Sequence, residues 1–169
     1  MLIITEKIHQ ILNNKNISEN KLANLINYHS GSLNKIIKGQ QSVSDSVIEK
    51  LSQNLEVSTD EIKGWILADK CSKEVLKLAI EAKNENHENL ILTSKIDALL
   101  RDKNLSRTSL SKIINYSQGR LNEIIIGKKS MSKTVLAKIS NVLEISEDEI
   151  KSWILADKYS LKTLKTAII

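Results

Sequence analysis

The chain contains one sequence unit twice, and this repeat limits the folds that are open to it. Residues 2–81 align with residues 90–169 at a constant offset of 88 positions without a gap, and 42 of the 80 aligned pairs are identical. The segment from Trp65 to Lys70 recurs unchanged as Trp153 to Lys158. A period of about 80 residues is longer than the roughly 20–50 residues of solenoid repeats. We therefore expect two small domains, at 1–81 and 90–169, joined by a polar linker at 82–89.

The composition favours helices. The chain has no proline and only five glycines, and its 41% hydrophobic and 27% charged residues are typical of a soluble globular protein. Since residues that break helices are scarce, we expect an all-α fold in which each repeat forms a five- to six-helix bundle.

Several classes of protein are disfavoured by what the sequence lacks. A single cysteine, Cys71, excludes an intrachain disulfide and a cysteine-based zinc site, and we expect its thiol to be buried and inert. Glu6 and His9 interrupt the first apolar residues, so no signal peptide is predicted. No stretch approaches the roughly 18 apolar residues of a membrane span. The sequence predicts a cytoplasmic protein without a membrane partner.

The net charge of +5 is divided unevenly between the repeats. Residues 1–88 carry 11 Lys and 12 Asp or Glu, which gives 11 − 12 = −1. Residues 89–169 carry 11 Lys, 3 Arg and 8 Asp or Glu, which gives 14 − 8 = +6. If the partner is a polyanion, we expect the second repeat to bind it more tightly.

Capping residues mark the helices of the first repeat. Ser18 is a suitable N-cap for a second helix, and Asn27 tolerates the left-handed conformation of a tight connection. Gly39 ends a third helix that starts near Ser30. Ser58 and Glu61 form a capping box at the start of a fifth helix, as Ser146 and Glu149 do in the second repeat. A shorter last helix follows. We expect Trp65 and Trp153, in the fifth helices, to lie in the core.

The second and third helices carry the functional signal. Two short helices joined by a tight turn, with a small residue at their crossing, are typical of a helix-turn-helix. The segment runs from Ser18 to Gly39 with Ala23 at the crossing, and its counterpart in the second repeat has Ser111 there. This pattern resembles the lambda-repressor-like family, also called the Cro or xenobiotic-response-element type, over about 60 residues of each repeat. The resemblance implies a DNA-binding fold.

The apolar spacing of the third helix supports the same interpretation. With Leu33, Ile36 and Ile37 buried, the opposite face turns outward, and a helix of this width fits the major groove of DNA. Both repeats place a glycine, Gly31 or Gly119, in the first turn of this helix. Either close approach of a partner to the backbone or entry into the helix after the turn explains it.

Helical geometry and the resemblance together give the candidate DNA contacts. By the resemblance, Arg120 pairs with guanine and Gln118 with adenine, whereas Arg107 and the lysines after the third helix contact phosphates. The first repeat departs from this pattern at Glu19, and the second departs at Glu123 and Ile126. The candidates are Ser30, Gly31, Ser32, Asn34, Lys35 and Lys38 in the first repeat and Arg107, Gln118, Gly119, Arg120, Asn122, Glu123, Lys128 and Lys129 in the second.

The resemblance implies a sequence-specific regulator of transcription, repressor-like and similar to phage regulators, whose two units act on double-stranded DNA as a covalent pseudo-dimer. One alternative is a protein-interaction module, such as a phage or plasmid accessory protein, that uses the near-neutral first repeat. Another is RNA binding, although aromatic side chains for base stacking are few. The sequence leaves open the operator, repression or activation, the orientation of the units and any further dimerisation.

An enzyme is not predicted, and neither a cofactor nor a metal is expected. His9 and His29 correspond to Asp97 and Ser117, so the repeats share no histidine. No glycine-rich phosphate loop or zinc-binding spacing occurs, which leaves no candidate catalytic or metal-ligating residues.

Overall fold

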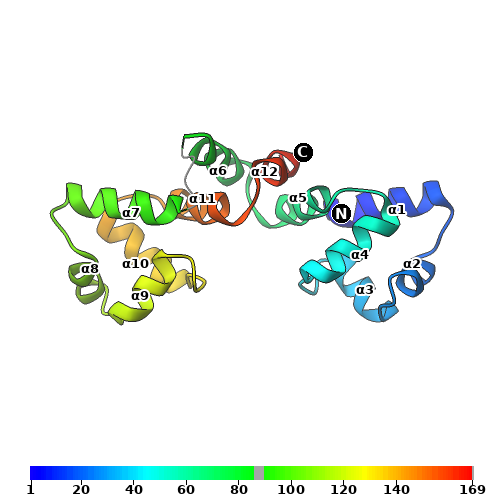
Figure 1. Cartoon of the computed structure of the whole chain (residues 1–169), viewed down its shortest axis with the longest axis horizontal. Helices are drawn as coiled ribbons and strands as arrows, with labels where there is room; N and C mark the ends of the chain where they lie inside the picture. The colour runs from blue at the N-terminus through cyan, green and yellow to red at the C-terminus, as the bar shows by residue number, and fades with distance from the viewer. Residues whose placement is uncertain (86–89, 169) are drawn as a thin grey trace. The chain divides into compact units, whose positions relative to one another are not determined.

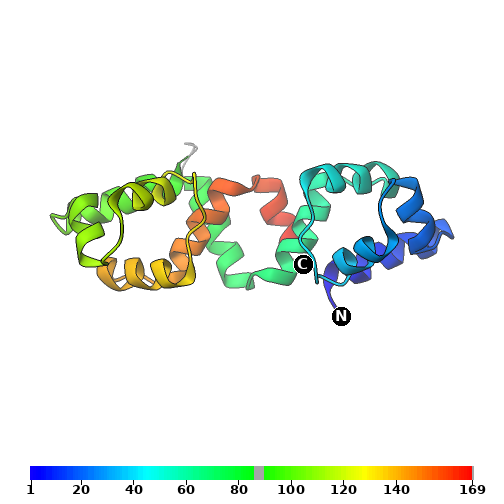
Figure 2. The same cartoon turned by 90° about the horizontal axis from the view of Figure 1, so that it is seen from below.

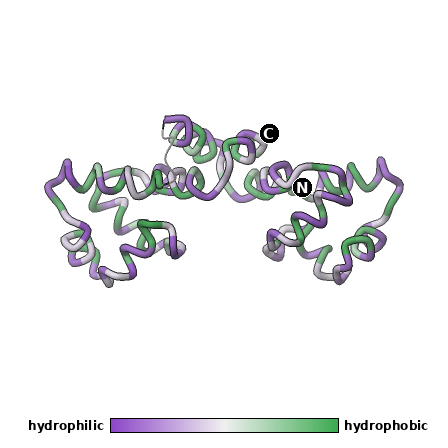
Figure 3. Tube along the Cα trace, viewed as in Figure 1, coloured by the Kyte–Doolittle hydropathy of each residue, from purple (hydrophilic) through white to green (hydrophobic). Residues whose placement is uncertain are grey.

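The computed structural model describes residues 1–85 and 90–168, and every regular element in these ranges is an α-helix. The all-α prediction is therefore confirmed. The chain divides into two compact units: unit 1 comprises residues 1–73 and 162–169, and unit 2 comprises residues 74–161. Figure 1 labels the helices, and Figure 3 shows hydrophobic and hydrophilic residues alternating along them.

Unit 1 is a helical bundle around a single apolar cluster. The cluster is formed by inward-facing residues of its first five helices, among them Ile8, Leu22, Leu33, Leu51 and Ile62. The helices of this unit are α1 (Ile3–Lys15), α2 (Glu19–Leu25), α3 (Ser30–Ile37), α4 (Asp45–Leu55), α5 (Thr59–Lys70) and α12 (Leu161–Ala167), the last entering the unit at Lys162.

Unit 2 reproduces this arrangement with the residues of the second repeat. Ile96, Leu110, Leu121 and Ile150 are fully buried, as their counterparts are in unit 1. The helices of this unit are α6 (Lys73–Glu85), α7 (Ile91–Asp102), α8 (Arg107–Ile113), α9 (Gln118–Ile125), α10 (Lys133–Leu143) and α11 (Glu147–Lys158).

The compact units differ from the sequence repeats in their sixth helices. The first repeat ends with α6, which belongs to unit 2, and the second repeat ends with α12, which belongs to unit 1. The prediction of a shorter last helix is wrong for α6, which has 13 residues. Without glycine or proline, the helix continues through the first part of the predicted linker to Glu85. Linker residues 86–89 lie outside the described residues.

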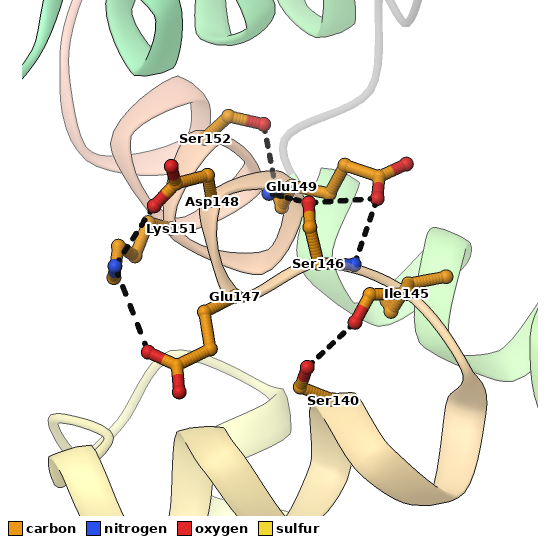
Figure 4. Close-up of polar contacts among 8 residues, drawn as sticks. All are labelled: Ser140, Ile145, Ser146, Glu147, Asp148, Glu149, Lys151 and Ser152. Carbon is orange, nitrogen blue, oxygen red and sulfur yellow. Dashed lines mark hydrogen bonds and ion pairs between the residues drawn. The ribbon is translucent and has the colours of Figure 1, made fainter.

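The predicted caps are confirmed. Ser18 accepts a hydrogen bond from the backbone N–H of Lys21, and Asn27 has a left-handed φ of 49°. Both capping boxes form, at Ser58 with Glu61 and at Ser146 with Glu149. Figure 4 shows the second box, together with the bond from Ser140 Oγ to the Ile145 carbonyl that ties the end of α10 to the start of α11. These local signals fix where the second, fourth and fifth helices of each repeat start.

Asp69 at the end of α5 caps the start of α1 from a distance. Leu2, the N-cap residue of α1, supplies no side-chain cap, so the first amides of the helix need another acceptor. The two carboxylate oxygens of Asp69 accept from Ile3 N at 2.7 Å and from Ile4 N at 3.0 Å. Asp157 does the same in unit 2, at identical distances. The anion also complements the positive end of the helix dipole.

α1 is tied in turn to the end of the third helix. Thr5 Oγ1 donates to the Ile37 carbonyl at 2.6 Å, and Thr93 Oγ1 donates to the Ile125 carbonyl at 2.8 Å. Because helix ends leave carbonyls without intrahelical partners, these bonds satisfy groups that would otherwise lack them. The position of the third helix therefore depends on α1, and through Asp69 on α5.

The two tryptophans lie in the core as predicted, with Trp65 6% and Trp153 8% exposed. The expectation that Cys71 is buried is wrong, because this side chain is only partly buried. It lies just after α5, where the chain leaves the bundle in an extended conformation. None of the described helices is both long and apolar enough to cross a membrane.

We predict that Asp69→Ala lowers the free energy of unfolding of unit 1 by about 1–2 kcal/mol, because two amides at the start of α1 lose their acceptor. Urea denaturation measures this change. The control is Asp102→Ala, which removes an exposed aspartate and should stay within about 0.5 kcal/mol of the wild type. Equal stability of the two variants would contradict the capping role.

Candidate nucleic-acid interface

The crossing of α2 and α3 requires a small residue. Ala23 is fully buried, and its carbonyl accepts from the Tyr28 amide at 2.9 Å, which closes the turn after α2. Asn27 provides the left-handed residue within the turn. α3 then places Leu33, Ile36 and Ile37 in the core.

Unit 2 builds the same turn with a serine. Ser111 is 4% exposed, and its hydroxyl donates to the Thr108 carbonyl at 2.8 Å, so the buried oxygen is satisfied within α8. The Tyr116 amide donates to the Ser111 carbonyl at 2.8 Å, and Asn115 has a φ of 49°. The substitution of serine for alanine therefore leaves the geometry of the turn unchanged.

The outward side of each third helix is open. In α3, Ser30, Gly31, Lys35 and Lys38 are exposed, whereas Ser32 and Asn34 are partly buried at the flanks. Figure 2 views unit 2 from the side of α9, with no other helix of that unit in front of it. In unit 2, Gln118, Gly119, Arg120, Lys128 and Lys129 are exposed, and Arg107, Asn122 and Glu123 are partly buried.

Arg107, at the start of α8, is held by a carboxylate of the same unit. Its Nε donates to Asp97 Oδ1 at 2.7 Å, and its Nη2 donates to Asp97 Oδ2 at 2.6 Å. The hydrogen bond to Asp97 raises the pKa of Arg107, although partial burial opposes the shift. A bidentate pair of this kind fixes the guanidinium, so a phosphate contact by Arg107 has to compete with Asp97 or share the side chain with it.

Glu19 occupies the same position in unit 1 and is also paired. It lies 2.6 Å from His9 Nε2, and it accepts from Asn34 Nδ2 at 2.9 Å. Partial burial raises the pKa of Glu19, but the hydrogen bonds from Asn34 and His9 outweigh it and leave the pKa below its usual value. Glu19 therefore links α1 to the flank of α3.

The two repeats thus link the same two positions, with the carboxylate on the second helix in unit 1 and on the first helix of the repeat in unit 2. His9 and Glu19 in unit 1 correspond to Asp97 and Arg107 in unit 2, at the offset of 88 residues. Both positions have changed together, and the link between the first and second helices is kept. The sequence analysis did not predict this contact. The signal is that an acidic residue is lost from position 19 to position 107 and gained from position 9 to position 97 when the aligned repeats are compared.

Partners within the unit hold some of the candidate contacts on α9. Gln118 Nε2 donates to Thr108 Oγ1 at 2.8 Å, which fixes the amide beside α8. Glu123 forms an ion pair with Lys129 at 2.6 Å, and the hydrogen bond and charge of that lysine lower the pKa of Glu123. The carboxylate that departs from the family pattern is therefore neutralised within unit 2.

Arg120 is available to a partner, whereas Asn122 carries a buried, unpaired oxygen. No hydrogen bond or ion pair to Arg120 occurs in the described part of the chain, and the side chain is exposed. Asn122 Oδ1 is buried and has no hydrogen-bond partner. In unit 1 the counterpart Asn34 donates its Nδ2 to Glu19. Arg107 stands in place of Glu19 in unit 2, and because a guanidinium has no acceptor, Asn122 cannot make the same bond.

The glycines in the first turn of the third helix differ in their surroundings. A Cβ placed at Gly31 would lie 3.1 Å from a ring carbon of His29, whereas one at Gly119 would meet nothing within 4 Å. Neither residue has a positive φ. At Gly119, therefore, neither the backbone conformation nor the packing of unit 2 requires glycine, which favours close approach of a partner from outside.

The loop after the third helix is packed differently in the two units. In unit 1, Leu2 lies over Gly39, 2.6 Å from where a Cβ would be, and the adjacent cavity has a volume of about 30 Å³. In unit 2, Leu90 is 49% exposed, and the equivalent cavity beside Gly127 and Lys128 has about 500 Å³. The basic loop after α9 is therefore packed less tightly against its unit than the loop after α3 is.

The described residues contain no group of three or more histidine, cysteine, aspartate or glutamate side chains arranged to hold a metal ion. The candidate residues that gather on one surface of each unit are mostly polar or basic, so this surface is suited to binding a polyanion.

Comparison with known protein families gave two matches. Residues 8–62 match the family described as helix-turn-helix, and residues 95–156 match the family described as Cro/C1-type HTH DNA-binding domain. The expected resemblance is thereby confirmed for both repeats. Comparison with curated proteins gave no match, and comparison with solved structures gave none either.

We predict that Arg107→Glu destabilises unit 2 by about 1 kcal/mol, because it places a carboxylate against Asp97. Adding Asp97→His should restore most of this loss, since the double variant recreates the pair of unit 1 with Asn122 available as a second donor. Thermal or urea unfolding of the two variants measures the coupling. Equal stabilities of the single and double variants would show that the two positions are independent.

Proposed function

Since both repeats of this chain belong to the Cro/C1-type helix-turn-helix DNA-binding family, we propose that the protein is a sequence-specific transcriptional regulator. It binds double-stranded DNA through α3 and α9 as a covalent pseudo-dimer, with each helix in the major groove of one half-site. No catalytic step is part of this proposal.

The observation that most supports the proposal is the outward face of α9. Gly119 is open to solvent although nothing in unit 2 requires glycine there, and Arg120 beside it is exposed and makes no hydrogen bond or ion pair within the described residues. An arginine next to a backbone without a side chain suits a bidentate contact to guanine at close range. Lys128 and Lys129 follow in the loop and suit phosphate contacts.

We further propose that the two half-sites differ in sequence. The third helices present Ser30, Ser32 and Lys35 in unit 1 but Gln118, Arg120 and Glu123 at the same positions in unit 2. The flanking asparagines also differ, because Asn34 is held by Glu19 whereas Asn122 is not held by an acidic residue. Each set of side chains favours its own bases.

Selection of bound fragments from a random pool of duplex DNA tests the proposal. We expect enrichment of a sequence with two dissimilar half-sites, and an affinity that falls with salt at a slope near −0.9 per neutralised phosphate. Failure to enrich any duplex, or binding that salt does not weaken, would contradict DNA recognition.

A protein-interaction module is the second candidate function. It is favoured by unit 1, where Glu19 replaces a residue suited to phosphate and the first repeat carries a charge of −1. In that case a single protein would bind at fixed stoichiometry through unit 1 and would remain bound after nuclease treatment. Weak DNA binding by unit 1 together with such a partner would favour this function for the first repeat.

We predict that Arg120→Ala relaxes the preference at one base position by about 1–3 kcal/mol, because the bidentate contact is lost. Lys128→Ala serves as the comparison, since loss of a phosphate contact should weaken binding to all sequences alike and reduce the salt slope by about one. Competition binding with single-base variants of the selected duplex measures both effects. If Arg120→Ala weakens binding to all the duplex variants equally, Arg120 does not read a base.

We predict that Gly119→Ala weakens DNA binding by at least about tenfold without lowering the stability of unit 2. The added methyl group meets nothing in the protein, and alanine favours a helix over glycine by up to about 1 kcal/mol. Urea denaturation and titration with the selected duplex separate the two effects. Unchanged DNA affinity would mean that the glycine does not face the duplex.

A further inference from the structure

Each compact unit is completed by a helix that belongs to the other repeat. Unit 1 takes residues 162–169 from the end of the second repeat, and unit 2 takes α6 from the end of the first. Within unit 1, α12 lies near α5, at the end of the bundle away from α2 and α3 (Figure 1). The exchanged helices thus lie away from the candidate DNA-binding face of their unit.

α12 fits closely against α5. A Cβ at Gly64, in the middle of α5, would lie 2.8 Å from both Cβ and Cγ2 of Thr166 and 3.2 Å from its backbone carbon. Because one of these atoms is backbone and the other two belong to a short β-branched side chain, a larger residue at position 64 would displace α12. Glycine inside a helix costs about 1 kcal/mol relative to alanine, so its presence indicates that this close approach matters.

Polar and apolar contacts also hold α12 in this position in unit 1. Thr163 Oγ1 donates a hydrogen bond to Asp60 Oδ1 in the first turn of α5. Thr163, Leu164 and Ala167 are all buried, at 1% exposure or less. A helix of seven residues is marginal alone in water, so its order depends on this packing.

α6 is bound within unit 2 by different residues. Lys83 Nζ donates to the Ala156 carbonyl near the end of α11 at 2.6 Å, and Glu85 pairs with Lys95 of α7 at 3.2 Å. The apolar side of α6, formed by Val75, Leu76, Ala79 and Ala82, is buried. Ser152 takes the place of Gly64 on α11, and it is also buried and small.

The connection before each sixth helix explains how the chain leaves its own bundle. Helices that turn back within a unit have a left-handed residue at the C-cap, as at Asn16 and Glu56, or directly after it, as at Asn27. The fifth helices instead end in extended residues, Cys71 with φ −125° and Tyr159 with φ −120°. Short connections between packed elements favour exchange of the element that follows them.

We propose that the surface of α5 around Asp60 and Gly64, and its counterpart on α11, is a receptor for the sixth helix of another copy of this repeat. In the tandem chain, the other repeat supplies that helix reciprocally. The exchange therefore holds the two repeats together without help from the peptide link at 86–89. The tandem protein then corresponds to a helix-exchanged homodimer of the single repeat, joined into one chain. This inference is independent of the proposed DNA binding.

Cleavage of the link in the full-length protein tests the proposal. A protease recognition sequence is inserted within residues 86–89, the folded protein is cut, and its mass in solution is measured by size-exclusion chromatography with light scattering. We expect the two fragments to stay together with the mass of the uncut chain, which is 19.0 kDa plus the insertion. Separation of the fragments, folded or unfolded, would overturn the proposal.

Thiol cross-linking of the cut protein identifies the exchanged helix itself. In a Cys71→Ser background, the pair Asp60→Cys and Thr163→Cys is compared with Asp60→Cys and Val75→Cys, since Val75 is the aligned counterpart of Thr163. A short bifunctional thiol reagent should join the two fragments covalently in the first pair and not in the second. If only the second pair reacts, within one fragment, each repeat keeps its own sixth helix and the proposal is wrong.

A glycine variant tests the same contact in the cut protein without introduced cysteines. The quantity measured is the affinity of the two fragments for each other. Gly64→Ala should weaken the association of the fragments by at least about tenfold, since the methyl group displaces α12. Gly119→Ala is the control, because it makes the same substitution in a helix where the methyl group meets nothing. Equal association of the two variants would contradict the role of α5 as the receptor.

Discussion

The hydrogen bonds from the first amides of α1 and α7 to an aspartate near the end of the fifth helix are the interaction on which each unit depends. Asp69 fixes α1 against α5, and Thr5 then connects α1 to the last carbonyls of α3. Asp157 and Thr93 repeat the chain of contacts in unit 2. Because α1 lacks a local cap, the carboxylate supplies both an acceptor and a charge that complements the helix dipole. The angle at which the third helix presents its outer face is thereby set by a residue far from that face.

The sequence was sufficient to predict the features that depend on short-range signals. Apolar spacing and caps such as Ser18, Asn27 and the Ser58–Glu61 box gave the helices and the helix-turn-helix, since each signal acts within one turn or connection. Long-range contacts were missed. Asp69 lies 65 or 66 residues from its partners, so no local pattern connects them. The exchange of sixth helices was also missed, because two helices of similar apolar pattern fit either receptor in a sequence analysis. Identity between the repeats does not reveal the His9–Glu19 and Asp97–Arg107 contacts either, because both positions differ between the repeats.

The differences between the repeats concentrate on the surface and not in the core. Leu33 and Leu121 are buried alike, whereas the residues that face outward beside them have changed in charge and in hydrogen-bonding capacity. Under the proposed function, change on this one face retains two helix-turn-helix scaffolds and gives each its own base preference. Reciprocal exchange of the sixth helices adds a reason for the two scaffolds to remain a pair, since each bundle is incomplete without a helix from the other repeat.

The central claim is that the outer faces of α3 and α9 contact a DNA duplex. Amide chemical shifts of the isotope-labelled full chain, followed during titration with a selected duplex, test it most directly, because the five glycines report on distinct places. We predict large shifts at Gly31 and Gly119 and in the loops at Gly39 and Gly127, with little change at Gly64 beneath α12. A duplex that binds while leaving Gly31 and Gly119 unperturbed would contradict the account.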